Sequence, residues 1–560
     1  MAMTSADYDE PLLLTDTCIE GMVNYKGEKI KNNNNEFGRW NSASRVIVIG
    51  GIESFVFFGI ASNLISILTM QLGQSTATAA QNINAWSGFI LMLPVLTAYV
   101  GDAYLGRFRA ILFSTLIYVL GLGLLTLYTS QLAACSNNAK DNLSCSSPST
   151  LEVIFFFSSL YLIGIGCAGY KTCAPAFGAD QFDELNPNES KSKSSFFNWW
   201  LFGLSVGSGS SHLILNYVQD NLGWGLSFGI SCISMVIALI IVMSGTKSYR
   251  YTHIKDTDKA NPLKWLTNGF LDVVKNWRST SSTSSTIPIQ VEPITNITPG
   301  SKNAGTTSVI STVEDVKAVL RLAPVWIIGL IYPIVYAQVL TFFTKQGSTM
   351  DRSIGPDFQV PAASIQIFLS ISTILFAATY DRIFVPILQA FTGKSNGITT
   401  LQRIGGGIFI SAMSMVVAAV VEHRRLKIAH EFGLVDDSKA TVPMVIWWLI
   451  PQYVLSGLAL VFAVVGFQEF FYDQVPNGLR SVGLCLYTTM FGIGNFLSVL
   501  LISVIQKATT AGNQHGWIAN NINQAHLDYF YWFLSGLSVI ELVAFLCFSK
   551  SFVYKQGPPM

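Results

Sequence analysis

The chain carries about twelve apolar segments, each close to the ~20 residues that a helix needs to cross a bilayer. Because backbone groups in lipid must form their hydrogen bonds within the protein, we expect helices rather than strands. Of all residues 50% are hydrophobic and only 12% are charged, too few charges for an ordinary soluble protein. The sequence therefore predicts an all-α polytopic membrane protein with twelve transmembrane helices. The predicted spans are 45–69, 84–101, 108–129, 152–173, 195–217, 223–244, 320–343, 359–379, 401–421, 442–466, 480–505 and 527–549.

A long polar stretch separates the first six predicted spans from the last six. Within it, apolar residues recur at helical spacing between 263 and 277, which predicts an amphipathic helix, and a Ser/Thr-rich segment follows. The arrangement predicts two six-helix bundles. The predicted parts are a disordered cytosolic tail at 1–43, an N-terminal bundle at 44–244, a cytosolic linker at 245–318, a C-terminal bundle at 319–550 and a cytosolic tail at 551–560.

The distribution of charged residues and cysteines limits which partners the protein can bind and in which membrane it can lie. Lys and Arg gather in the loops on one side of the predicted spans, which places the N-terminus in the cytosol. The net charge of +1 and the lack of a basic, aromatic-rich cluster argue against a nucleic-acid partner, and we expect no metal or cofactor. Cys135 and Cys145 share a predicted outer loop, where they are either disulfide-bonded or free. An acidic dileucine-like run at 9–14 is either a vacuolar sorting signal or a chance match, so the membrane is plasma or vacuolar.

Two ionisable residues lie well inside apolar spans, Glu53 in the first and Lys171 in the fourth. A charge in the membrane is costly, so each should face the bundle interior and find a partner. We therefore predict that Glu53 and Lys171 form a buried pair that gates a solute pathway. The alternative is a pair that only locks the packing. Glu541, in the last span, is either a buried polar anchor or a residue near the membrane interface.

The two halves of the sequence carry similar Asp and Arg residues after corresponding spans. Asp102 and Arg107 follow the second span, and Asp381 and Arg382 follow the eighth. Internal repeats are typical of secondary transporters, with the solute site between them near the midplane. We predict that these residues form latches on the inner face; charges that merely mark the membrane interface are the alternative.

Several short runs stand out along the chain. They are GADQFD at 178–183, FFNW at 196–199, VYAQ at 335–338 after Trp326, PAASIQ at 361–366, WLIPQY at 448–453 and EFFYDQ at 469–474. These runs resemble those of the plant nitrate/peptide transporters, which belong to the proton-coupled oligopeptide transporter branch of the major facilitator superfamily. The likeness extends, in order, over about residues 24–555.

The resemblance implies a major facilitator fold of twelve spans in two bundles, working by alternating access that is usually powered by proton entry. It also implies that Lys171 is the family's fourth-span lysine. The family's first span carries Glu-x-x-Glu followed by Arg or Lys, whereas the matching positions here are Gly50, Glu53 and Ser54. One acid and one base remain. Glu53 can still bind Lys171 in one state and a proton in the other.

The resemblance also indicates a substrate cavity with little charge. Leu460 stands where peptide-binding relatives carry a glutamate, so a substrate ammonium has no counter-ion. Tyr336 stands where some nitrate carriers have a histidine, and a phenol cannot become cationic. Aromatic and hydroxyl-bearing walls suit a flat or amphipathic organic metabolite better than a small ion. The predicted lining is Phe57, Phe58, Trp199, Ser205, Tyr332, Tyr336, Gln366, Trp448, Leu460 and Asn495.

We therefore expect a secondary-active transporter of an organic metabolite, with the solute, protons and membrane lipid as its partners. An uncoupled facilitator and a nitrate or peptide symporter of the same family are the nearest alternatives. A transport-dead receptor or scaffold is more remote. The sequence contains no nucleophile–base constellation, metal-ligand spacing or phosphate-binding loop, so we do not expect an enzyme.

Overall fold

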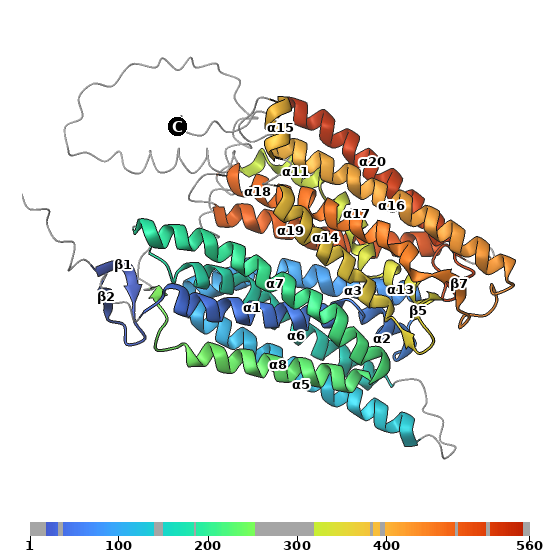
Figure 1. The fold of residues 1–560 in the computed structure, drawn as a ribbon, viewed down its shortest axis with the longest axis horizontal. Helices are drawn as coiled ribbons and strands as arrows, with labels where there is room; N and C mark the ends of the chain where they lie inside the picture. The colour runs from blue at the N-terminus through green and yellow to red at the C-terminus, as the bar shows by residue number, and fades with distance from the viewer. Residues whose placement is uncertain are drawn as a thin grey trace, which may run out of the picture. The chain divides into compact units, whose positions relative to one another are not determined.

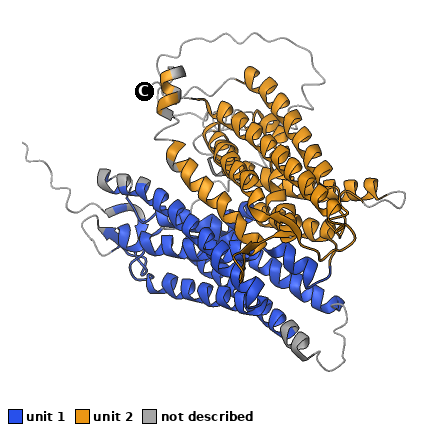
Figure 2. Cartoon of the chain, turned by 45° about the vertical axis from the view of Figure 1, so that its right-hand side comes forward, with its two compact units in different colours: residues 1–73, 93–255 blue, residues 74–92, 256–560 orange. Residues whose placement is uncertain are grey.

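The structure is a computed structural model that describes residues 18–31, 37–138, 149–183, 186–252, 319–380, 385–392, 398–475, 480–510 and 516–552. The chain forms two compact units, unit 1 (1–73 and 93–255) and unit 2 (74–92 and 256–560) (Figure 2). Almost all of the predicted linker, including its amphipathic helix and Ser/Thr-rich segment, lies outside the described residues. So does most of the predicted C-terminal tail.

In unit 1, α1 packs along α7, and α5 packs against both α6 and α8 (Figure 1). Small residues permit this close approach, since a Cβ atom on Gly207 of α7 would collide with the carbonyl group of Gly51 on α1. The helices of unit 1 are α1 (Arg39–Ala61), α2 (Leu64–Met70), α4 (Pro94–Val100), the π-helical turn η1 (Gly101–Leu105), α5 (Arg107–Asn138), α6 (Thr150–Ala179), α7 (Pro187–Asn221) and α8 (Trp224–Ser244).

A small antiparallel sheet joins the chain before α1 to the chain after α8. Its strand order is β2–β1–β3, with β1 (Cys18–Val23) in the centre between β2 (Lys29–Lys31) and β3 (Tyr251–Thr252). Strands β1 and β2 lie within the stretch for which the sequence predicts a disordered tail; residues 1–17 and 32–36 of that stretch are outside the described part. The sheet therefore fixes both ends of the helical part of unit 1.

In unit 2, α16 packs against α20 and α17, and α3 packs against α19. The α3–α19 contact includes a buried hydrogen bond from the Asn84 amide to the Ser498 hydroxyl at 2.9 Å. The helices of unit 2 are α3 (Thr76–Met92), α11 (Ala323–Ile328), α12 (Ile331–Tyr336), η2 (Ala337–Val339), α13 (Phe342–Ser348), η3 (Ala362–Gln366), α14 (Ile367–Thr379), α15 (Val385–Thr392), α16 (Thr400–Glu431), η5 (Ile446–Leu449), α17 (Ile450–Ala459), η6 (Leu460–Val464), α18 (Val465–Asp473), α19 (Arg480–Thr509) and α20 (Leu527–Ser551).

Helices occupy all twelve predicted segments, so the all-α membrane fold is confirmed. Among the described residues, nine helical stretches are long and apolar enough to cross a membrane. The second predicted span is divided between the units, because α3 groups with unit 2 and α4 with unit 1. The predicted domain boundaries stay a prediction.

Two predicted spans begin too early. The segment 359–379 starts at the last residue of a short strand, Phe358–Gln359, and becomes helical only at Ala362. The segment 442–466 was expected to be helical throughout, but its first residues form β7 (Val442–Val445), which pairs in parallel with β4 (Met350–Asp351). Pro443 disfavours helical dihedral angles in the residue before it, and valine suits a strand. Helix therefore starts only at η5. Two further short strands, β5 (Ser353–Ile354) and β6 (Phe358–Gln359), form a hairpin in the same unit.

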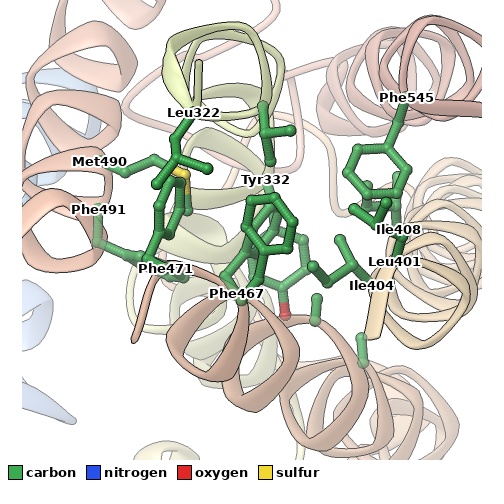
Figure 3. Close-up of a cluster of buried hydrophobic side chains, with 14 of the residues drawn as sticks. Leu322, Tyr332, Leu401, Ile404, Ile408, Phe467, Phe471, Met490, Phe491 and Phe545 are labelled. Atoms are coloured by element: carbon green, nitrogen blue, oxygen red, sulfur yellow. The ribbon is translucent and has the colours of Figure 1, made fainter. Parts of the chain in front are cut away.

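The hydrophobic core of unit 2 surrounds Tyr332 of α12 (Figure 3). Phe467 and Phe471 from α18, Phe491 from α19 and Phe545 from α20 belong to this core. Tyr332 contacts Phe467 and Phe491 with ring centroids 6.3 and 6.0 Å apart. The core places a phenol among aromatic rings deep within unit 2.

Candidate functional site

The structure brings the two predicted gating residues together inside unit 1. Glu53 lies on α1 and Lys171 on α6, and the Lys171 Nζ atom is 3.6 Å from Glu53 Oε1. The sequence predicts a buried pair, but only the acid is buried: the side chain of Glu53 is 1% exposed, whereas that of Lys171 is 39% exposed. The long aliphatic stem of lysine explains this, because it lets the ammonium group reach away from the packed helices.

Two further side chains complete the surroundings of this pair. The Lys171 ammonium lies over the ring of Phe57, 3.4 Å from its centroid, which is a cation–π contact. The Cys167 thiol donates a hydrogen bond to Glu53 Oε1 at 3.3 Å. Glu53 Oε2 makes no hydrogen bond to any described residue. Sequence reasoning missed Cys167, although it lies four residues before Lys171 and therefore on the same face of α6.

The two positions where charges of the resembling family are absent serve helix packing. A Cβ atom on Gly50 would lie 2.6 Å from the ring of Trp200 on α7. The Ser54 hydroxyl donates a hydrogen bond to the backbone carbonyl of Leu204, also on α7, at 2.8 Å. Both positions thus hold α1 against α7. Glu53 is left without a second acid beside it at these positions.

The other predicted cavity residues of unit 1 are only partly grouped. Phe58 contacts Phe57 edge to face at 5.4 Å and lies 5.8 Å from the ring of His212, a buried histidine that sequence reasoning missed. Ser205 is half-buried on α7. Trp199 is exposed and packs edge to face on Phe202. Phe57 is the predicted lining residue in direct contact with the charged pair.

In unit 2, Tyr332 and Tyr336 are stacked with ring centroids 6.2 Å apart. Leu460 begins the π-helical turn η6, a kind of distortion that is frequent at functional sites. Asn495 donates a hydrogen bond to the carbonyl group of Phe491 at 2.8 Å, which occupies its amide. These residues are half-buried or buried. Their role as a cavity lining stays a prediction.

Two predicted lining residues lie among other partners. The Gln366 amide donates a hydrogen bond to the Thr344 hydroxyl at 2.8 Å and is buried. Trp448 is exposed in η5, immediately after β7, and the Arg424 guanidinium lies over its ring at 4.4 Å. Gln366 thus ties η3 to α13, and Trp448 ties η5 to the end of α16.

The predicted latch residues are described only in part. Arg107, the first residue of α5, forms an ion pair with Asp180, at the end of α6, through both carboxylate oxygens at 2.7 and 2.8 Å. Asp180 belongs to the GADQFD run, which the sequence analysis used only for the resemblance. The side chain of Asp102 and the residues Asp381 and Arg382 lie outside the described part of the chain. Arg107 therefore joins α5 to α6, and the rest of the latch prediction is untested.

A second ion-pair cluster lies at the same end of unit 1. Glu189, in the first turn of α7, accepts hydrogen bonds from Arg39 at 2.7 Å and from Arg250 at 2.8 Å, and from the backbone N–H of Asp183 at 2.8 Å. Burial on its own would raise the pKa of the Glu189 carboxyl. The donors outweigh burial and lower that pKa below its ordinary value of 4.5. The ionised Glu189 carboxylate therefore holds α1, α7 and the chain after α8 together.

Comparison with known proteins decides the family. Residues 108–518 match PTR2, the POT family. The chain is 51% identical over 532 residues to Protein NRT1/PTR FAMILY 5.10 of Arabidopsis thaliana, which covers 93% of this chain and 94% of that protein. The chain belongs to the POT family. The predicted resemblance is thereby confirmed, and the protein is a multi-pass integral membrane protein that transports solutes.

Solved POT family structures show the same fold at low sequence identity. A crystal structure of an auto-inhibited POT family peptide transporter has a TM-score of 0.68 at 18% identity, covering 93% of this chain and 99% of the other. A POT family transporter in complex with 5-aminolevulinic acid has a TM-score of 0.63 at 14% identity, covering 91% of this chain and 96% of the other. At these identities the likeness concerns the fold alone.

Proposed function

We propose that this POT family transporter is a proton-coupled, secondary-active carrier of an organic metabolite, working by alternating access in the plasma or vacuolar membrane. The observation that carries the proposal is the Glu53–Lys171 pair. Its N–O distance of 3.6 Å is long for an ion pair, and Glu53 Oε2 has no hydrogen-bond partner among the described residues. The second oxygen is therefore free to take a proton.

The attraction between Glu53 and Lys171 and the cost of burying the Glu53 carboxylate are of similar size, which favours a pair that can form and separate. At 3.6 Å the attraction between two unit charges is roughly 4–5 kcal/mol at an effective dielectric constant of about 20. The cost of burying the Glu53 carboxylate is also several kcal/mol, so the two terms nearly cancel. A small change in local structure can then decide whether Glu53 holds Lys171 or a proton. The proton passes from solution to a carboxylate oxygen and returns to solution when the pair forms again.

The substrate class rests on the residues that replace charged ones. Leu460 supplies no carboxylate for a substrate ammonium, and Tyr336 supplies no cation for nitrate. Aromatic side chains remain near the charged pair in unit 1 and around Tyr332 in unit 2. These surfaces favour a largely apolar organic solute with few charges. One solved POT family transporter is in complex with 5-aminolevulinic acid, a small organic molecule.

Uptake by the full-length chain in proteoliposomes tests the proposal. Nitrate, a dipeptide and a panel of aromatic metabolites are offered side by side, with and without an imposed proton gradient. We expect an aromatic metabolite to accumulate only with the gradient. Strong nitrate or dipeptide accumulation would contradict the substrate class. Transport of no solute, together with intact folding, would favour a receptor or scaffold.

The variant Glu53→Gln tests the coupling residue. We expect it to equilibrate the substrate without accumulating it, because the site can no longer exchange a proton. Glu152→Gln is the matched control, since Glu152 caps the start of α6 on the exposed surface and should leave accumulation unchanged. Full accumulation by Glu53→Gln would show that protons are coupled elsewhere, and equilibration by the wild-type chain would favour an uncoupled facilitator.

A further inference from the structure

A second acid lies buried in unit 2, on the last helix. Glu541 of α20 is 1% exposed, and neither of its carboxyl oxygens completes a hydrogen bond with a described residue. The backbone of Tyr332 on α12 lies beside this carboxyl group. The Tyr332 hydroxyl is likewise buried without a partner among the described residues. Burying an ionised carboxylate without hydrogen-bond partners is costly, which makes Glu541 a candidate proton-binding group.

Glu541 is the inner end of a polar face on α20. Asp528, Tyr531, Ser535 and Ser538 are all buried, and each lies three or four residues from the next, so they form a continuous polar face that winds around α20 to Glu541. Asp528 Oδ1, the Tyr531 hydroxyl and the Ser538 hydroxyl make no hydrogen bond to the described part of the chain. This polar face runs roughly 20 Å at the usual helical rise.

The far end of the polar face reaches solvent. Asp528 Oδ2 lies 3.2 Å from Nδ1 of His423 on α16, and the His423 side chain is 72% exposed. His526, just before α20, lies 3.9 Å from the other oxygen of Asp528 and is also exposed. Further along, the Ser535 hydroxyl donates to the Ala412 carbonyl of α16 at 3.3 Å. The face thus begins beside an exposed histidine at the α16–α20 contact and ends at a buried acid beside α12.

The helix opposite Glu541 is interrupted. Gly329 and Leu330 separate α11 from α12, and α12 passes after Tyr336 into the 3-10 turn η2. Broken helices beside ionisable groups are typical of ion sites in transporters, because unwound backbone can change conformation without unfolding the bundle. Movement of α12 would therefore change the surroundings of the carboxyl group.

We propose that the polar face of α20 is a proton-access path and that Glu541 is a proton-binding site separate from Glu53. The proton enters from solution at the His423–Asp528 end and ends on a carboxylate oxygen of Glu541. Each hydroxyl on the way gains one O–H bond and gives up another, so the hydroxyl groups are unchanged overall. The other titratable or charged groups that neighbouring elements bring to this face are Glu422 and Arg425 from α16, Tyr332 from α12, Tyr453 from α17 and, next to Tyr332, Tyr487 from α19.

The fixed charges beside the path are paired with each other. Glu422 and Arg425 are joined through two hydrogen bonds at 2.6 and 2.8 Å. They face Tyr531 rather than Glu541. Among the described residues, the group that interacts with the Glu541 carboxyl is Tyr332. The charge of Glu541 is therefore set by solvent access and by the position of α12.

Infrared difference spectroscopy of the full-length chain in lipid tests this without any substrate. Spectra at acidic and alkaline pH should differ by the C=O stretching bands of protonated carboxyl groups, Glu53 among them, and Glu541→Gln should remove the band that belongs to Glu541. Glu541→Asp should shift it, which keeps the test valid if the glutamine variant folds poorly. An unchanged band in both variants, or a Glu541 band that persists at every pH, would overturn the proposal.

Hydrogen–deuterium exchange at the same band tests the path. Transfer into deuterated buffer shifts the band at a rate set by proton access, so Tyr531→Phe and Ser538→Ala should slow the shift severalfold. Tyr128→Phe is the matched control, because Tyr128 is also buried and its hydroxyl has no partner among the described residues, but it lies in unit 1. Equal rates in wild type, Tyr531→Phe and Ser538→Ala would refute the path. Because no transport is measured, failure here is distinct from failure of the Glu53 coupling.

Discussion

Each of the two units contains an acid–base pair on its helices, and the two pairs are built differently. In unit 2, Glu422 and Arg425 are 0% exposed, and both carboxylate oxygens accept from the guanidinium. Arg425 also donates to the Asn523 side chain at 2.6 Å and to the Ile522 carbonyl at 3.1 Å. In unit 1, Glu53 and Lys171 are 3.6 Å apart, and one oxygen of Glu53 has no partner among the described residues.

The difference distinguishes an ion pair that only stabilises the packing, here called a lock, from one whose carboxylate can change its protonation state, here called a switch. A planar guanidinium satisfies a carboxylate at two points and fixes its geometry, whereas an ammonium is a point charge on a flexible stem. Breaking the saturated pair leaves several buried groups without partners. Breaking the looser pair leaves one acid that can take up a proton and one base that can reach solvent. We expect Glu422–Arg425 to hold α16 to the chain before α20, and Glu53–Lys171 to change state.

The largest effect is expected from Arg425→Ala. Removing one partner of a fully buried pair costs about 3–5 kcal/mol, because the remaining charge stays buried. Thermal unfolding monitored by size-exclusion chromatography measures it. Arg424→Ala is the control, since Arg424 is exposed and only covers Trp448. A loss no greater than that of the control would mean that Glu422–Arg425 is not a lock.

Gly50→Glu should have the next largest effect. It restores one acid of the resembling family beside Glu53, but its Cβ atom would lie 2.6 Å from the Trp200 ring. Overpacking of this kind costs about 1–3 kcal/mol. Adding Trp200→Ala should recover much of the loss, and Gly209→Ala on α7, where a Cβ meets open space, should cause no loss of stability. The same unfolding measurement applies. If Gly50→Glu is as stable as wild type, α1 and α7 can separate more easily than the packing indicates.

Glu189→Gln should cost about 1–2 kcal/mol at neutral pH, because it weakens charge-assisted hydrogen bonds from two arginines. Since folding lowers the pKa of Glu189, its stabilisation is complete above the ordinary value of 4.5 and is lost as the pH falls below it. Melting temperatures of wild type and variant should therefore converge toward acidic pH. A difference that stays constant down to pH values below 4.5 would contradict the assignment.

The smallest stability effect is expected from Lys171→Ala, about 1 kcal/mol or less, because the lysine is partly exposed and Glu53 can protonate in its absence. Its effect on coupling should be large, with substrate accumulation lost in the proteoliposome assay. A stability loss as large as that of Arg425→Ala would make Glu53–Lys171 a lock as well, and the contrast between the units would disappear.

Much of the candidate site could be predicted from single charged residues that stand inside apolar segments. A charge inside a long apolar segment must find a partner, which is why the sequence alone was enough to pair Glu53 with Lys171. The Cys167 donor was predictable from its four-residue spacing to Lys171, yet a thiol in a span carries no signal of its own. Arg107 was predicted as a latch residue, but nothing local indicates that Asp180, far along the chain, is its partner.

By itself, the sequence determined the membrane fold, the helical segments and the family, because lipid allows few ways to satisfy a backbone and apolar length is a local property. Only the tertiary structure decided that Trp200 fills the space beside Gly50, that Glu422 and Arg425 are saturated while Glu53 and Lys171 are not, and that Glu541 faces Tyr332. Hydrogen-bond saturation and burial depend on which helices meet, and distant helices meet through packing that no local pattern encodes.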